Sequence, residues 1–374
     1  PLARALRNHG HAVAFSSSER FCQRIEQAGY QAFVAGIDLG EAYERTLAKP
    51  EAAALAGDQW AFGAHMFAGV AGPAKAKDLS KAIAAFSADL MVHDPMDFAG
   101  PLAAASAGLA CAGHGFGAIS PKAFCQLAAE LAEPAWQSWG LEFPPLANMF
   151  GDLYLDVCPP SFQDADISCV PSVQPLRPGD GDTVTGDSAP DWFDDLSADP
   201  RVYVTLGTID NDAPGVFEAV LSALGARAFN VVVTVGPSRD PAELGPQPDN
   251  IFVASYLPQS LILPRCHAVV CHGGSGTTLA ALRHGLPLLL LPQGANQFWN
   301  AERCEALGVG SSLTGDQLTV DAIGVAVDRL LAEPSYRQRA QSVRTEIDEM
   351  PNAEEAVALL ERLSKSAKMN ASRS

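Results

Sequence analysis

Residues 267–297 read HAVVCHGGSGTTLAALRHGLPLLLLPQGANQ, and this stretch decides the fold class. Its apolar opening predicts a buried strand, its glycines permit a tight turn, and the run beginning near Thr277 predicts a helix. A helix that opens directly after a strand presents unpaired amides and a positive dipole end to an anion. Ser275 and Thr277 add hydroxyl donors, and His272 adds an imidazole. The stretch therefore predicts a phosphate cradle in an α/β fold, with a plain glycine turn and a capping threonine as the simpler alternative.

The cradle differs from the two common nucleotide-binding motifs. A Walker loop needs a lysine followed by Ser or Thr after its glycines, and no such pair follows here. The dinucleotide fingerprint needs a third glycine at the position that Leu279 occupies. An anion bound here would therefore be held by backbone dipoles, hydroxyls and the imidazole.

Strand and helix patterns alternate on both sides of this stretch, which is typical of parallel sheets covered by helices. We therefore expect an α/β protein of two Rossmann-like domains facing across a cleft. The expected parts are an N-terminal domain (1–175), a linker rich in Pro, Gly and acids (176–198), a C-terminal domain (199–350), and a C-terminal helix with a frayed tail (351–374).

The sequence opens with a helix pattern. Leu2 and Leu6 lie on one face, Gly10 ends the helix, and residues 11–16 follow as a buried strand. A helix that leads into a parallel strand is the second half of a βαβ unit, so we expect an upstream strand and its loop. Such a loop would lie where α/β folds place their chemistry.

Composition excludes several classes of function. The 374 residues include 25 Lys and Arg against 43 Asp and Glu, a formal net charge of −18, which disfavours nucleic acid and anionic lipid as partners. The apolar run 285–292 is far shorter than the roughly 20 residues of a membrane span. Eight cysteines without a C-x-x-C pair indicate neither zinc nor a disulfide framework, and they favour the cytoplasm. The sequence does not indicate an oligomeric state.

Spaced motifs resemble one enzyme family. The sequence H-G-G-x-G-T at 272–277 precedes G-x-P-x-x-x-x-P at 285–292 and then Asn-Gln and Asn-Ala pairs within 296–301. The combination resembles family 1 glycosyltransferases of the GT-B fold, especially bacterial enzymes acting on macrolides, aromatic polyketides and glycopeptides. The resemblance implies an inverting transferase that moves a sugar from a dTDP or UDP donor to a small-molecule acceptor, a natural-product aglycone.

The same resemblance implies a donor site. Its diphosphate would be bound by His272 and by the turn residues Gly273, Gly274, Ser275, Gly276 and Thr277. Asn296 and Gln297 match an acidic-Gln pair that binds the sugar hydroxyls. Asparagine in place of the carboxylate is compatible with a deoxysugar, because it can donate as well as accept. Asn296 is equally sound as a helix N-cap.

Two further elements complete the implied donor site. Tyr256, Leu257 and Gln259 match an aromatic-x-Pro-Gln element that reads the nucleobase, with a core tyrosine at a strand end as the alternative for Tyr256. Thr208 follows the expected strand 201–206 and resembles the loop that faces the phosphates from the opposite side.

Catalytic candidates lie in the first half. Asp94 ends an expected strand and resembles the aspartate that orients the family's catalytic histidine, which we expect on the upstream loop. His93 should point to the opposite side of the strand. His114 and Phe116 lie in a glycine-rich connection and are candidates for the acceptor pocket, with a structural loop histidine as an equal alternative for His114.

Rival interpretations concern metals and the reaction type. The D-x-D sequences at 164–166, 180–182 and 210–212 could hold a metal ion on a diphosphate, but among 43 acids such sequences are expected by chance. We expect no metal and no cofactor. A nucleotide-sugar epimerase or hydrolase of the same fold, and an inactive transferase-like partner protein, stay open as alternative functions.

Overall fold

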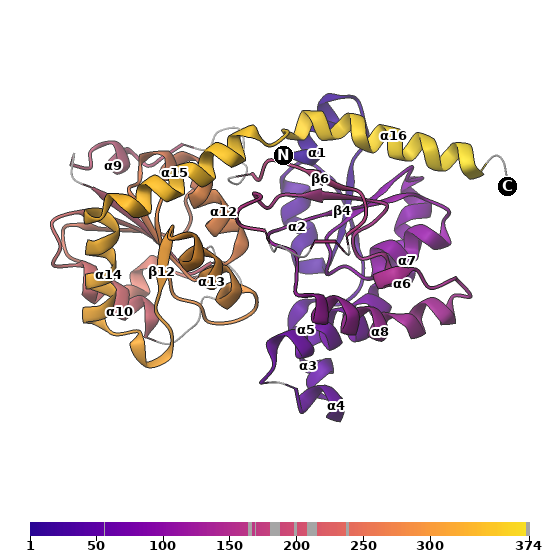
Figure 1. Ribbon diagram of the computed structural model, residues 1–374, viewed down its shortest axis with the longest axis horizontal. Coiled ribbons are helices and arrows are strands. Elements are labelled where there is room, and N and C mark those ends of the chain that lie inside the picture. The colour runs from indigo at the N-terminus through magenta and orange to yellow at the C-terminus, as the bar shows by residue number, and fades with distance from the viewer. Residues whose placement is uncertain are drawn as a thin grey trace. The chain divides into compact units, whose positions relative to one another are not determined.

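A computed structural model describes residues 1–55, 57–163, 167–168, 170–179, 188–197, 200–207, 215–236 and 239–371. The described chain forms two compact units (Figure 1). Unit 1 comprises residues from 1–157, 164–176 and 351–374, and unit 2 comprises residues from 158–163 and 177–350. Among the described residues, no helix has the length and apolar character needed to cross a membrane.

Unit 1 carries two groups of parallel strands with helices packed on them. Its elements are α1 (Leu2–Asn8), β1 (Ala14–Ser17), α2 (Glu19–Gln27), β2 (Gln31–Val34), α3 (Leu39–Leu47), α4 (Pro50–Ala53), α5 (Gln59–Met66), the π-helical turn η1 (Phe67–Ala71), α6 (Gly72–Phe86), β3 (Met91–His93), α7 (Ala99–Ser106), β4 (Cys111–His114), α8 (Lys122–Ser138), the 3-10 turn η2 (Pro145–Asn148), β5 (Leu153–Asp156), β6 (Val173–Pro175) and α16 (Ala353–Ala371). Strands β1 and β2 form one parallel pair, and β3, β4, β5 and β6 form a four-stranded parallel sheet in that order.

The core of unit 1 lies where α6, α7 and α8 meet the four-stranded sheet. Leu79, Leu102, Phe124, Trp136 and Tyr154 are all buried there. Helix α7 is made almost entirely of small residues, and every residue from Ala99 to Ala104 is buried. Small residues are required at this position, since a Cβ added to Gly100 would lie 2.7 Å from the Cβ of His93 on β3.

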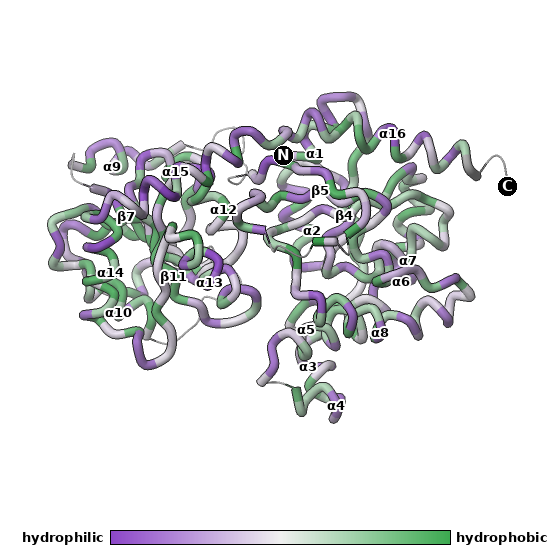
Figure 2. Tube along the Cα trace, viewed as in Figure 1, coloured by the Kyte–Doolittle hydropathy of each residue, from purple (hydrophilic) through white to green (hydrophobic). Residues whose placement is uncertain are grey.

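Helix α16 belongs to unit 1 although it ends the described sequence. Figure 2 shows hydrophilic and hydrophobic residues alternating along it, and its apolar face packs against α1. His9 and His11 lie 3.0 Å from Glu354 and Glu361 on α16. These pairs are exposed, so burial of the apolar face, not ion pairing, supplies most of the docking energy.

Unit 2 is a single parallel sheet between layers of helices. Its elements are α9 (Asp191–Asp194), β7 (Arg201–Thr205), α10 (Val216–Leu224), β8 (Asn230–Thr234), the 3-10 turn η3 (Pro241–Leu244), β9 (Ile251–Ala254), α11 (Gln259–Ile262), the 3-10 turn η4 (Leu263–Arg265), β10 (Ala268–Cys271), α12 (Ser275–Arg283), β11 (Leu288–Leu290), α13 (Gln297–Leu307), β12 (Gly310–Ser312), the 3-10 turn η5 (Gly315–Gln317), α14 (Val320–Ala332) and α15 (Pro334–Glu349). The central strands β8, β10 and β11 are buried along their whole length, as expected for a parallel sheet covered on both faces.

The strand order of unit 2 is β12-β11-β10-β7-β8-β9, and every pair is parallel. Counted within the unit, this is the doubly wound order 6-5-4-1-2-3. The strand order reverses between β7 and β10, and α/β folds bind ligands outside the carboxyl ends of the strands at such a switch point. The α/β expectation is confirmed, and the sheet order predicts where a ligand should bind.

The stretch expected to be a linker is partly packed on unit 2. Its residues 191–194 form α9, whose Phe193 is fully buried. The guanidinium groups of Arg201 and Arg265 lie 5.3 Å and 4.5 Å from the Phe193 ring. These cation–π contacts fix the chain just before β7.

Candidate functional site

The switch point of unit 2 brings the ends of β7 and β10 together. Thr205 on β7 pairs in register with Cys271 on β10, so the residues that follow each strand emerge side by side. The glycine turn then leads into α12, which begins at Ser275, two residues earlier than the sequence predicts. The correction places Ser275 and Gly276 in the first helical turn, because Gly274 with φ −62° and ψ 140° takes the N-cap position.

The imidazole of His272 lies between two glycines at this switch point. A Cβ added to Gly274 would lie 2.4 Å from His272 Nε2, and one added to Gly207 would lie 2.8 Å from the same atom. Cβ atoms essentially never approach other atoms within 3.0 Å. The ring can therefore occupy this position only because both neighbours are glycine, and Gly207 also has a φ of +93° that favours glycine.

The start of α12 has the groups that bind anions. No side chain caps its N-cap residue, so its first amides and its positive dipole end remain available. Ser275 and Thr277 are buried in the first turn, with 8% and 9% of their surfaces exposed. The first of these hydroxyls receives hydrogen bonds from two asparagines and the second from a glutamine.

Two asparagines of α13 converge on Ser275. Asn296 Nδ2 donates to Ser275 Oγ over 2.8 Å, and Asn300 Nδ2 donates to the same oxygen over 3.1 Å and to Gly273 O over 2.8 Å. Asn296 does occupy the N-cap position of α13, but its side chain makes no capping hydrogen bond. The N-cap interpretation of Asn296 is therefore wrong as to the side chain, which bonds to Ser275 at the start of α12 instead.

Asn300 is a residue of this site to which the sequence analysis gave no role. Its side chain is 1% exposed, and it joins the turn to α13 through two hydrogen bonds. The Asn-Ala pair, noted only as part of a motif, was the available signal. A role could not be given to it because the bonded partners lie 25 and 27 residues away in the sequence.

The two glutamines predicted to bind the donor, Gln259 and Gln297, also form hydrogen bonds with other residues of the chain. Gln259, the first residue of α11, donates through Nε2 to Thr277 Oγ1 over 3.2 Å. Gln297 is buried, and its Oε1 accepts from the amides of Gln293 and Gly294 at 2.7 Å and 3.1 Å. Gln297 Oε1 thus fixes the loop before α13. The amide nitrogen Nε2 of the same side chain can donate hydrogen bonds to another group.

The aromatic element beside the turn has one exposed and one buried residue. Tyr256 is 53% exposed, and Leu257 is 5% exposed. The alternative of a core tyrosine does not fit this exposure, and an exposed ring is available for stacking. Thr208 lies outside the described residues.

In unit 1, the predicted catalytic aspartate follows β3. Asp94 is exposed and its Oδ1 accepts from the amide of Met96 at 2.8 Å. Partial desolvation by the surrounding protein and the nearby Asp97 carboxylate raise the pKa of Asp94. His93 is buried, with Nδ1 donating to the Asp94 carbonyl at 2.9 Å, and burial lowers its pKa. The His93 side chain is thus buried, whereas that of Asp94 is exposed.

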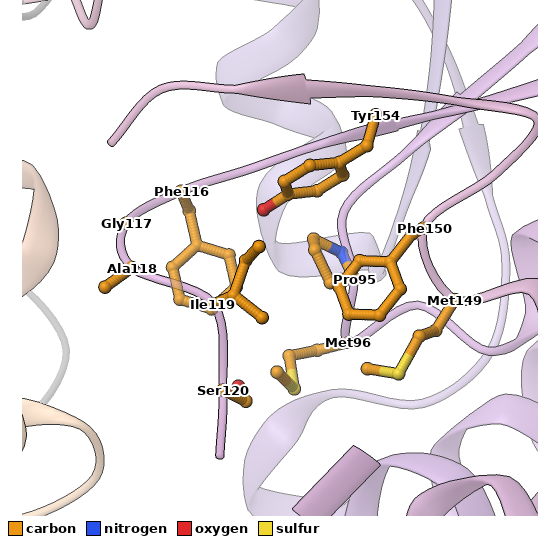
Figure 3. Close-up of a pocket in the computed structure, with 10 residues that line it drawn as sticks. All are labelled: Pro95, Met96, Phe116, Gly117, Ala118, Ile119, Ser120, Met149, Phe150 and Tyr154. Atoms are coloured by element: carbon orange, nitrogen blue, oxygen red, sulfur yellow. The ribbon is translucent and has the colours of Figure 1, made fainter. Parts of the chain in front are cut away.

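The predicted acceptor residues follow β4. His114 donates through Nδ1 to Gly115 O over 2.7 Å, and burial lowers its pKa. Phe116 is 40% exposed and lines a small hollow that opens to solvent (Figure 3). The lining residues are Pro95, Met96, Phe116, Gly117, Ala118, Ile119, Ser120, Met149, Phe150 and Tyr154. Phe116 is thus part of an apolar hollow, and His114 is not among its lining residues.

The described residues offer no cluster of metal ligands. They contain no group of three or more His, Cys, Asp or Glu side chains arranged to hold a metal ion. The D-x-D sequences at 164–166, 180–182 and 210–212 lie outside the described residues.

Comparison with known proteins matches both halves of the chain. Residues 4–207 match the N-terminal domain of the family described as erythromycin biosynthesis protein CIII-like, and residues 218–363 match its C-terminal domain. The chain belongs to this family. Its members are family 1 natural-product glycosyltransferases, as the sequence motifs predict.

Named relatives of the chain include two enzymes from Streptomyces species. The chain is 35% identical to the L-demethylnoviosyl transferase of Streptomyces niveus, over 67% of this chain and 64% of the relative. It is 29% identical to the aklavinone 7-beta-L-rhodosaminyltransferase of Streptomyces galilaeus, over 97% of this chain and 91% of the relative. The chain thus spans less than two thirds of the first relative and most of the second.

Solved glycosyltransferase structures confirm the GT-B fold. The glycosyltransferase VinC in complex with dTDP is 27% identical, with a TM-score of 0.76, and the match covers 98% of this chain and 95% of VinC. The spinosyn rhamnosyltransferase SpnG complexed with spinosyn aglycone is 26% identical, with a TM-score of 0.80, and the match covers 96% of this chain and 95% of SpnG.

Proposed function

We propose that this chain is an inverting glycosyltransferase that moves a sugar from a nucleotide donor, dTDP-linked or UDP-linked, to a natural-product aglycone. The observation that carries the proposal is the site at the β7–β10 switch point. There an imidazole between Gly207 and Gly274 lies at the start of a helix whose N-cap carries no capping side chain. An imidazole donor and a helix dipole suit a diphosphate that carries two negative charges in the donor and gains a further one as it leaves.

The relatives favour transfer over the alternative functions. Two of them are named as an L-demethylnoviosyl transferase and an aklavinone 7-beta-L-rhodosaminyltransferase, and structures of VinC and SpnG contain dTDP or an aglycone. These names do not favour an epimerase, a hydrolase or an inactive partner protein. Unit 2 would bind the donor and unit 1 the acceptor, and the domain assignments 1–175 and 199–350 remain proposals.

The reaction we propose is a single displacement without a metal ion. The acceptor oxygen forms a bond to the anomeric carbon as the bond between that carbon and the diphosphate oxygen breaks. His272 and the amides of Gly274, Ser275, Gly276 and Thr277 stabilise the leaving diphosphate. The acceptor proton passes to a general base. The Asp94 carboxylate orients this base and stabilises the positive charge that the base gains with the proton. Inversion at the anomeric carbon follows from the in-line attack.

The remaining predicted residues would select the substrates. Asn296 and Gln297 lie beside the turn, where a donor sugar would extend, and the exposed Tyr256 ring can stack on a pyrimidine. The hollow beside Phe116 presents aromatic rings and two methionines, which suit an apolar aglycone of variable shape. The seven described cysteines are buried, and we place the chain in the cytoplasm, where thiols stay reduced.

The test is His272→Ala in the full chain. Turnover of dTDP-sugar and aglycone should fall about 10²- to 10³-fold, as for the loss of one donor to a developing anion. Binding of dTDP, measured by calorimetry, should weaken in the same variant. Unchanged turnover and unchanged dTDP binding would refute the assignment of the diphosphate to this turn.

A further inference from the structure

The hydroxyl of Ser275 receives two hydrogen bonds from amide side chains. Asn296 Nδ2 lies 2.8 Å from Ser275 Oγ and Asn300 Nδ2 lies 3.1 Å from it. A serine hydroxyl has one proton to donate and two lone pairs to accept. With both lone pairs occupied, the proton is the one group that Ser275 can still offer.

The orientation of Asn300 is fixed by its second partner. Its Nδ2 lies 2.8 Å from the carbonyl oxygen of Gly273, and a carbonyl oxygen can only accept. The amide nitrogen of Asn300 therefore faces both Gly273 and Ser275, and the hydroxyl must accept from it. Because Asn300 is 1% exposed, no water is expected to replace this contact.

The hydroxyl of Thr277, the second one in the first turn of α12, also accepts a hydrogen bond from an amide side chain. Gln259 Nε2 donates to Thr277 Oγ1 over 3.2 Å, from an element on the other side of the turn. Amide side chains from two separate segments thus donate to the two hydroxyls of the first turn of α12. The arrangement directs hydroxyl protons toward whatever the helix start binds.

We propose that Asn296 and Asn300 are positioning residues that hold the Ser275 hydroxyl as a donor to the donor diphosphate. Asn296 then acts on the diphosphate through Ser275, whereas the family resemblance implies that Asn296 binds the hydroxyls of the donor sugar. The inference rests on the proposed function and refines it, because it separates phosphate binding from sugar binding at one residue. Asn300, which is buried, holds the same hydroxyl through a second hydrogen bond.

The test compares dTDP, which carries no sugar, across four proteins: wild type, Asn296→Ala, Ser275→Ala and the double variant. Calorimetry should show that Asn296→Ala weakens dTDP binding about 3- to 10-fold, the effect of one neutral hydrogen bond. In the Ser275→Ala background, Asn296→Ala should change dTDP affinity less than twofold, because the hydroxyl on which it acts is gone. Gln317→Ala, an exposed amide elsewhere in unit 2, serves as the control and should bind as wild type.

A second variant covers the case in which truncation disturbs the loop. Asn296→Asp keeps the shape of the side chain but can only accept, so it would draw the Ser275 proton away from the phosphate. It should bind dTDP more weakly than Asn296→Ala, with a melting temperature close to that of wild type.

Each outcome separates this inference from the proposed function. If wild type binds dTDP while Asn296→Ala and Asn296→Asp keep wild-type affinity, Asn296 does not act through Ser275 and the inference is wrong. The same holds if the two single effects simply add in the double variant. If wild type itself does not bind dTDP or UDP, the proposed function fails first.

Discussion

Gly274→Ala tests the placement of His272 with the smallest possible change. The backbone at Gly274, φ −62° and ψ 140°, is one that alanine adopts without strain. The new Cβ would lie 2.4 Å from His272 Nε2, whereas carbon atoms prefer separations of about 3.5–4.0 Å. The imidazole must therefore move by about 1 Å away from the new methyl group.

The displacement should remove most of the imidazole's contribution to diphosphate binding. A hydrogen bond to a charged group contributes about 1.5–3 kcal/mol, which corresponds to a loss of about 10- to 150-fold in dTDP affinity. Turnover should fall about 100-fold, since displacements of about 1 Å near a reacting centre have effects of that size. The measurements are calorimetric titration with dTDP, initial rates with a dTDP-sugar, and melting temperature.

Two comparisons make the result specific. Gly69→Ala adds a methyl group in unit 1 where no heavy atom lies within 4 Å, and it should bind dTDP as wild type does. In a His272→Ala background, Gly274→Ala should cost little further affinity, because the ring with which it collides is absent. A folded Gly274→Ala protein that binds dTDP as tightly as wild type would show that His272 does not reach the diphosphate.

Three further predictions concern other parts of the molecule. Phe116→Ala should raise the KM for the aglycone about three- to tenfold and leave dTDP affinity unchanged, because it removes one aromatic wall of the hollow; a change in dTDP affinity alone would contradict this. Asp94→Asn should lower turnover yet raise the melting temperature at pH 7, because the raised pKa of Asp94 means that its ionised form destabilises the fold. The difference in melting temperature should grow as pH rises from 3.8, the pKa of Asp in the unfolded chain, to the raised pKa of folded Asp94, and it should vanish below pH 3.8. A pH-independent difference would argue against this explanation. Asn250→Ala should lower the free energy of unfolding by about 1–3 kcal/mol in denaturant titrations. The reason is that Asn250 Nδ2 donates to the carbonyl oxygens of Leu224, Arg227 and Phe229 at 3.0 Å, 3.2 Å and 3.0 Å. Unchanged stability would show that water replaces the lost amide.

Catalytic roles were the least accessible to sequence reasoning. Asp94 was chosen from a strand end and a family resemblance, and the structure adds the neighbouring Asp97, which lies three residues further along the chain. The hollow beside Phe116 includes Met149 and Tyr154 from a later turn and strand, which no local pattern connects to it. Pockets form from segments that meet only after the sheet has been assembled.

The sequence alone determined the features that depend on neighbouring residues. The apolar run 267–271, the glycines after it and the helix pattern that follows are local signals, because strand burial, turn geometry and helix capping act over a few residues. The α/β class and the turn before the helix therefore followed from one stretch of about 30 residues.

Tertiary structure decided which side chains meet at that turn. The packing of His272 against Gly207 depends on the parallel pairing of β10 with β7, and the bond from Asn300 to Ser275 depends on how α13 packs beside α12. Helix α16 likewise joined unit 1 because its apolar face is buried against α1, at the opposite end of the sequence. Such contacts are set by register and packing over tens to hundreds of residues, and no local periodicity encodes them.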